Sequence, residues 1–308
     1  MWHSVQNHSW RGIIYTFCSL ANCADGASPY TQLISGFDGN LYGITSQGGA
    51  NGVGTVFKLT LSGKLTTLHS FNLGGASIPC GNGPGICAPL VQANNGNFYG
   101  TTFNGGLNVG GTSYGDGTFF ELTPSGTFTT VYNFCSQPNC TDGANPEGFV
   151  QATDGNFYGV TGFGPGGSFS GNGTLFKMTP TGALTTLHTF TGTDGSYSVG
   201  LVQHTNGTFY GESAYGGTGN GTLFSLSVGL KPFVRTLESS GNVGSTIQIL
   251  GDNLSSATSV TFNGTAAAFT VTSDTLIIAT VPAGATTGFV EVTTSSRTLK
   301  SNAKFRVK

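Results

Sequence analysis

Three acidic side chains in the first part of the chain are the best candidates for catalysis. Asp116, Glu147 and Glu212 have no counterpart in the similar segments around them. Two carboxyl groups about 5 to 10 Å apart can hydrolyse a glycosidic bond, one as acid and the other as base or nucleophile. Glu212 stands out because it follows a Tyr-Gly pair after which comparable segments carry Ile, Thr or Val. The competing interpretation is a solvated side chain near a channel, since most carboxylates are exposed and have no chemical role.

Three aspartates, Asp25, Asp142 and Asp194, lie in repeated Asp-Gly loops and are the candidate metal ligands. Calcium takes carboxylate and backbone oxygens, but it needs several ligands and each loop offers one carboxylate. We therefore expect no bound metal or other cofactor and keep calcium at these aspartates as the alternative. The sequence also lacks the motifs of serine hydrolases, zinc proteases, phosphate loops and dinucleotide sites. This favours a non-enzymatic protein and leaves an enzyme based on carboxylates open.

The six cysteines form three local pairs. They are Cys18 with Cys23, Cys80 with Cys87, and Cys135 with Cys140. Even, local pairs in Gly- and Asn-rich loops favour disulfides, whereas a zinc site would need two pairs close together. Disulfides indicate an oxidising compartment, so we expect an extracellular or cell-surface location. The start of the chain, MWHSVQNHSWRG, does not resemble an export signal, because it has neither a basic nor an apolar region.

The composition excludes two classes of partner. Charged residues make up 8% of the chain and the net charge is -2, so the clustered Lys and Arg that bind nucleic acid are missing. No apolar run approaches the roughly 18 to 20 residues of a membrane span. With 51 Gly but 11% aromatic residues, the chain is expected to fold around aromatic cores.

Three short motifs recur through the first 230 residues with a period of 52 to 59 residues. A Tyr-Gly element ends at Gly43, Gly100, Gly159 and Gly211, a Gly-Thr-x-Phe element starts at Gly54, Gly117, Gly173 and Gly221, and a Gly-x-Leu/Phe-Thr-Thr element starts at Gly63, Gly126 and Gly182. Each repeat contains four short strand patterns separated by turn signals, which is the plan of a β-propeller blade. We therefore predict an all-β fold with a propeller of four four-stranded blades.

The last repeat ends before its fourth strand, and the chain begins with a surplus copy of that strand, IIYTF at 13–17. Pairing of this segment with 223–227 would close the ring and remove exposed strand edges. An alternating strand order places every long loop on one face of the ring and every tight turn on the other. Function concentrates on loops held by a rigid scaffold, so the long-loop face is the expected binding surface. Its aromatic residues are Tyr30, Phe103, Tyr114, Phe163, Phe169, Tyr197 and Tyr215.

From Phe233 the repeats stop and strand-like runs follow at a spacing of eight to twelve residues, as in a small β-sandwich. The predicted strands are 245–250, 259–262, 268–271, 276–281, 288–293 and 304–307. We divide the chain into a propeller over 1–230 and a sandwich over 231–308.

Two family resemblances support this division. The motifs DGNFYG, GTLFKMTPTG and LTTLHTF, over about 12–228, resemble the GloVer-type tandem repeat of secreted bacterial proteins. The segments GSTIQILGDNL, VTFNG and VPAGATTG resemble an IPT/TIG domain, which is immunoglobulin-like. The first resemblance implies an extracellular, often surface-attached protein without established catalytic residues, and the second implies a spacer or binding module.

These observations leave three functional hypotheses. The first is a non-enzymatic extracellular binding or adhesion protein whose long-loop face recognises a polysaccharide or a cell-surface protein. The second is a carbohydrate-active hydrolase or lyase with a carboxylate site at the mouth of the ring. The third is a structural subunit of a surface layer or filament that associates with itself through the edges of the sandwich.

Overall fold

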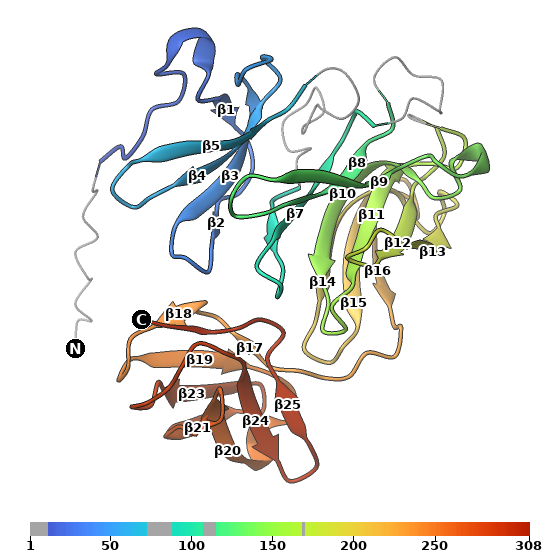
Figure 1. Cartoon of the computed structure of the whole chain (residues 1–308). Helices are drawn as coiled ribbons and strands as arrows, with labels where there is room; N and C mark the ends of the chain where they lie inside the picture. The colour runs from blue at the N-terminus through green and yellow to red at the C-terminus, as the bar shows by residue number, and fades with distance from the viewer. Residues whose placement is uncertain (1–11, 73–87, 107–114, 168–169) are drawn as a thin grey trace, which may run out of the picture.

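The computed structural model describes residues 12–72, 88–106, 115–167 and 170–308 (Figure 1). Within them the chain is all-β, as predicted, with three single-turn 3-10 helices: η1 (Ala21–Cys23), η2 (Pro138–Cys140) and η3 (Leu254–Ser256). The first part consists of four antiparallel sheets that follow one another along the chain, and the second part contains two four-stranded sheets and one two-stranded sheet.

Each of the first four sheets is formed by one repeat. The first sheet contains β1 (Ala27–Pro29), β2 (Ile34–Ser35), β3 (Leu41–Gln47), β4 (Thr55–Leu59) and β5 (Leu65–Ser70); the second contains β6 (Val91–Gln92), β7 (Phe98–Thr102), β8 (Thr118–Leu122) and β9 (Phe128–Asn133). The third contains β10 (Ala144–Gln151), β11 (Phe157–Phe163), β12 (Thr174–Met178) and β13 (Leu184–Thr189), and the fourth contains β14 (Ser196–Gln203), β15 (Phe209–Tyr215) and β16 (Thr222–Leu226). In the second, third and fourth sheets consecutive strands pair with one another, so each is a meander; in the first sheet β1 and β2 both pair with β3.

The recurring Tyr-Gly and Gly-Thr-x-Phe motifs are two halves of one packing unit. In the third sheet Gly159 of β11 pairs with Phe176 of β12, and the Phe176 ring lies over the glycine. A Cβ on Gly159 would come within 2.6 Å of that ring, so the position requires glycine. The same pairing occurs in the other sheets between Gly43 and Phe57, Gly100 and Phe120, and Gly211 and Phe224.

The sheets pack against one another through a repeated aromatic contact. The tyrosine of one Tyr-Gly pair packs face to face or tilted on the phenylalanine of the next repeat, with ring centroids 4.2 to 4.4 Å apart. The pairs are Tyr42 with Phe98, Tyr99 with Phe157, and Tyr158 with Phe209. A glutamine adds a polar link at each interface, because Gln92, Gln151 and Gln203 each accept a hydrogen bond from a backbone N–H of the preceding sheet. Residues of β2, β6, β10 and β14 border one cavity, so the first strands of the four sheets converge.

The expected closure of the ring is wrong for the described residues. The segment 12–17 is not a strand and lies on the first sheet, where Phe17 packs edge-on against Phe57 and the Ile14 carbonyl lies beside Gly63. Its position on the first sheet matches the position that the last strand of each sheet has on the following sheet. Leu68 of β5, for example, lies beside Gly126 of the second repeat in the way that Ile14 lies beside Gly63.

The fourth sheet therefore ends at β16 without a further strand, and no pairing joins it to the first sheet in the described part of the chain. A physical reason is visible in the first repeat. Ser35 takes the position of the linking glutamine, and its side chain is too short to reach a preceding sheet.

The C-terminal part is built from two four-stranded sheets around one apolar core. One sheet has the order β17 (Arg235–Thr236), β19 (Thr246–Leu250), β23 (Leu276–Thr280) and β22 (Phe269–Ser273); the other has the order β21 (Thr265–Ala266), β20 (Ala257–Phe262), β24 (Val290–Thr294) and β25 (Thr298–Lys300). A parallel pair, β18 (Ser240–Gly241) with β26 (Arg306–Val307), completes it. In β19 the alternation places Ile247 and Ile249 in the core. Each of the six strand segments predicted from the sequence overlaps an observed strand.

This C-terminal part packs against the tight-turn ends of the four sheets (Figure 1). Thr205, after β14, donates a hydrogen bond to Asp252, and Asn94, after β6, donates one to the backbone of Asn302. The long loops thus remain at the opposite ends of the sheets.

Candidate functional site

The predicted loop disulfides form in the two loops that the structure describes. Cys18 bonds to Cys23 and Cys135 bonds to Cys140. The third predicted pair, Cys80 and Cys87, lies outside the described residues. Each observed disulfide closes the loop that precedes the first strand of a sheet, on the long-loop side.

The three candidate calcium ligands act as internal acceptors of their own loops. Asp25 accepts hydrogen bonds from the Tyr15 hydroxyl at 2.7 Å and from the backbone and hydroxyl of Ser19. Burial opposes ionisation here, but these hydrogen bonds outweigh it and lower the pKa of Asp25 to about 2. Asp142 repeats the arrangement with Tyr132 and Ser136.

Asp194, the third of these aspartates, accepts hydrogen bonds from His188 Nε2 and from the backbone and hydroxyl of Thr191. The carboxylates are therefore occupied by loop donors. Among the described residues, no three His, Cys, Asp or Glu side chains gather into a metal-binding group.

The predicted ligand-binding aromatics are only partly brought together. Phe103 is buried and Tyr30 is half exposed on the first sheet. Phe163 and Tyr197 pack edge to face with ring centroids 5.3 Å apart, and Tyr215 on the neighbouring strand is 61% exposed. Tyr114 and Phe169 lie outside the described residues. The aromatic candidates that meet therefore lie between the third and fourth sheets.

The three candidate catalytic carboxylates do not converge on one exposed pocket. Glu212 is exposed on β15, because the open fourth sheet leaves uncovered a position that is buried in the other sheets. Among the described residues its side chain has no hydrogen-bond or ion-pair partner. Asp116 is fully buried, and its backbone carbonyl accepts from Asn145 N at 2.7 Å. Glu147, two residues further along β10, is 5% exposed.

Glu147 has the most perturbed environment of the three. It stands on β10, where neighbouring repeats carry Tyr30 and Val199, next to a register shift that follows Pro146. Its side chain is hydrogen-bonded to Tyr197, while its buried Oε1 has no partner among the residues that the structure describes. Desolvation raises the pKa of Glu147 to about 8, although the hydrogen bond from Tyr197 acts in the opposite direction. At neutral pH this carboxyl is therefore mostly protonated.

Tyr197 links this buried carboxyl to the surface. Its backbone has φ of 56°, a left-handed conformation that a bulky residue adopts only when its surroundings hold it there. Burial raises the pKa of its hydroxyl to about 12, with Glu147 acting in the same direction. Packing by Phe163 and the hydrogen bond to Glu147 thus fix the ring beside exposed Tyr215.

The cluster of Glu147, Phe163, Tyr197 and Tyr215 is the candidate functional site. It offers aromatic faces, tyrosine hydroxyls and one buried carboxyl. Sequence reasoning selected all four residues, yet nothing in the sequence grouped them, because the contact depends on how the third and fourth sheets pack.

These features describe an all-β tandem-repeat protein with a second β-rich part that packs on its tight-turn face. The family model of the Gloeobacter/Verrucomicrobia repeat matches residues 9–114 and 84–275, which together span most of the chain. The chain therefore belongs to this repeat family. A search for relatives among curated proteins gave no match.

Several solved structures share a distant similarity of fold. A luciferin-regenerating enzyme is 14% identical with a TM-score of 0.42; the match covers 66% of this chain and 62% of that enzyme, so the chain spans less than two thirds of it. Virginiamycin B lyase from Staphylococcus aureus is 12% identical with a TM-score of 0.39 over 87% of this chain and 78% of that one. A gluconolactonase from Xanthomonas campestris is 14% identical with a TM-score of 0.39 over 82% and 72%. None of these similarities bears on the activity of this chain.

No helix in the described ranges is both long and apolar enough to cross a membrane.

Proposed function

We propose that the protein is an extracellular binding or adhesion protein that holds a polysaccharide on its long-loop face. The observation that carries this proposal is the aromatic pair of Tyr197 and Tyr215, one fixed by a buried neutral carboxyl and the other 61% exposed. Aromatic faces suit the apolar faces of sugar rings, and their hydroxyls suit sugar hydroxyls. The two loop disulfides fit an oxidising, extracellular setting.

The same proposal extends to the architecture. The four sheets act as blades of a β-propeller, which the convergence of their first strands on one cavity supports. The region 231–308 acts as an immunoglobulin-like IPT/TIG domain, which the two sheets around one core support. We favour binding over hydrolysis, since Glu212 stands alone and Asp116 and Glu147 are buried.

Binding can be tested with an array of neutral and acidic polysaccharides. We expect wild type to bind at least one glycan and Tyr215→Ala to weaken that binding about tenfold, as is common for an exposed aromatic anchor. Leu61→Ala is the matched control, because Leu61 is 70% exposed on a tight turn at the other face. An array on which wild type binds nothing would contradict the proposal.

A second candidate function, a subunit of a head-to-tail assembly, is favoured by the open end of the fourth sheet. Leu223 on β16 is 86% exposed, whereas its counterpart Leu175 is 2% exposed. Tyr210 is 42% exposed, whereas Tyr158 at the same position is 1% exposed. Leu223 and Tyr210 would both be buried if the first sheet of another copy, together with its segment 12–17, packed against the fourth sheet. This contact would resemble the packing of each sheet on the next one within the chain.

This assembly predicts concentration-dependent oligomers of the wild-type chain in light scattering. Leu223→Asp should abolish them, since a charge would be buried without a partner at the contact. Val243→Asp, at an exposed apolar residue of the C-terminal part and outside the contact, should leave them unchanged. A wild type that stays monomeric over a wide concentration range would exclude the assembly. The predicted contact is thus the end of the sheet array, instead of the sandwich edges expected from the sequence.

A further inference from the structure

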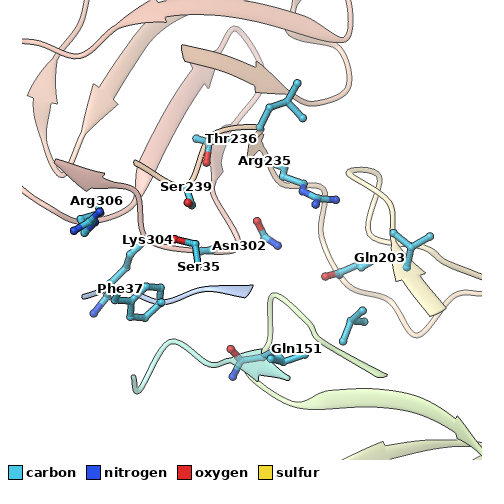
Figure 2. A pocket seen from close by; sticks show the side chains of 16 residues that line it. Ser35, Phe37, Gln151, Gln203, Arg235, Thr236, Ser239, Asn302, Lys304 and Arg306 are labelled. Atoms are coloured by element: carbon cyan, nitrogen blue, oxygen red, sulfur yellow. The ribbon is translucent and has the colours of Figure 1, made fainter. Parts of the chain in front are cut away.

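A cavity of about 360 Å³ lies between the four sheets and the C-terminal part. Its walls come from the first strands of the sheets, with Ser35, Val91, Gln151 and Gln203, and from the segments 235–239 and 302–306 (Figure 2). It is on the tight-turn side, opposite the face of Tyr215, and every repeat contributes to it.

The lining of this cavity is cationic. Arg235, Lys304 and Arg306 line it, and no Asp or Glu of the described ranges does. The whole chain has only 11 Lys and Arg against 13 Asp and Glu, so three basic residues without an acidic one are a concentration of positive charge. None of the three lies within 4.0 Å of a carboxylate in the described part of the chain.

The nearest acidic side chains along the sequence have other partners. Glu238 accepts a hydrogen bond from the backbone of Gln248. Asp252, which lines an adjacent cavity with Arg235, accepts from Thr205 at 2.6 Å. The positive charge of the cavity is thus left for a ligand.

The walls are held in place before any ligand arrives. Gln151 accepts from Asn94 N of the second repeat and donates to the Gly155 carbonyl of its own repeat, so its amide is held in place at the contact between the two sheets. The Arg306 guanidinium packs over Gly39, where an added Cβ would lie 2.8 Å from it. In Figure 2 Lys304 lies beside the ring of Phe37, which comes from the first sheet.

We propose that this cavity binds an acidic saccharide, with carboxylates held by Arg235, Lys304 and Arg306. Guanidinium groups match the geometry of carboxylates, and a lysine adds a mobile positive charge. Phe37 offers an aromatic face, while the hydroxyls of Ser35 and Ser239 offer partners for sugar hydroxyls. The site does not depend on the long-loop face and has a different ligand chemistry.

Calorimetric titration of the full chain with digalacturonate, maltose and inorganic phosphate tests this site. We expect digalacturonate to bind with an affinity that falls as salt rises, and maltose not to bind. Lys304→Gln and Arg306→Gln should each weaken binding tenfold or more, whereas Lys64→Gln, an exposed lysine on a tight turn, should not.

Thermal melting of each variant shows whether it remains folded, and Lys304→Arg should retain binding if the positive charge is what matters. Failure of wild type to bind digalacturonate, or equal binding of maltose, would overturn the proposal. Binding of phosphate alone would also overturn it, since the site would then be a plain oxyanion site.

Discussion

Replacing Glu147 by Gln is expected to remove most of a pH-dependent loss of stability between about pH 4.5 and 8. The ordinary pKa of this carboxyl is 4.5 and burial raises it to about 8 in the folded protein. The folded state therefore keeps the proton at pH values where the unfolded chain has lost it. The stability contributed by this group is fully present below 4.5, falls as pH rises toward 8, and stays lost above 8. At about 1.4 kcal/mol per pKa unit, the total is about 4 to 5 kcal/mol.

Urea unfolding of wild type and Glu147→Gln at about pH 5, 7 and 9 measures this difference. The variant should equal wild type near pH 5 and exceed it near pH 9 by a few kcal/mol. Tyr197, which faces Glu147, titrates near 12 and does not contribute in this window. His69, whose pKa burial lowers, is present in both proteins and cancels in the comparison. Glu212→Gln, an exposed carboxyl, is the matched control; parallel profiles for all three proteins would refute the prediction.

The repeat architecture could be predicted because it is local. Each Tyr-Gly element and the following Gly-Thr-x-Phe element belong to adjacent strands, so their spacing alone predicts a hairpin. The loop disulfides were predictable for the same reason, since Cys18 and Cys23 are five residues apart.

The open end and the site were not predictable, because they depend on contacts between sheets. Ring closure looked favourable from strand counting, but Ser35 replaces the glutamine that links each sheet to the one before it. The burial of Glu147 follows from the packing of the fourth sheet on the third, since Val199 stands at the same register shift in the fourth sheet and is 38% exposed.

Two positions near the tyrosine of the Tyr-Gly motif change together from one repeat to another, and this paired change indicates their role. In the third sheet Asp154 accepts from the Tyr158 hydroxyl and pairs with Lys177. In the second sheet Asn95 replaces the aspartate, and Glu121 replaces the lysine and accepts from the Tyr99 hydroxyl at 2.7 Å. One carboxylate per tyrosine is thus retained in each of the first three sheets, which indicates a structural role for both positions.

Phe176→Ala is expected to destabilise the protein by about 3 to 5 kcal/mol, the usual cost of removing a fully buried phenylalanine. Phe176 is 0% exposed, packs edge to face on Phe134 and covers Gly159. The matched control is Phe224→Ala in the open fourth sheet, where the ring covers Gly211 but is only half-buried. Because part of that surface is already in water, the control should cost about half as much. Equal losses would contradict the different packing of the two sheets.

Variants of Gly159 and Phe176 together test why the Tyr-Gly motif ends in glycine. Gly159→Ala alone should cost about 1 to 3 kcal/mol, because its methyl group meets the Phe176 ring and the Phe149 Cβ. In the double variant with Phe176→Ala, the new methyl group enters the space that the ring has left. The combined loss should therefore be smaller than the sum of the two single losses by about 1 kcal/mol or more. Additive losses would mean that the glycine is required for another reason, such as the approach of β10 to β11.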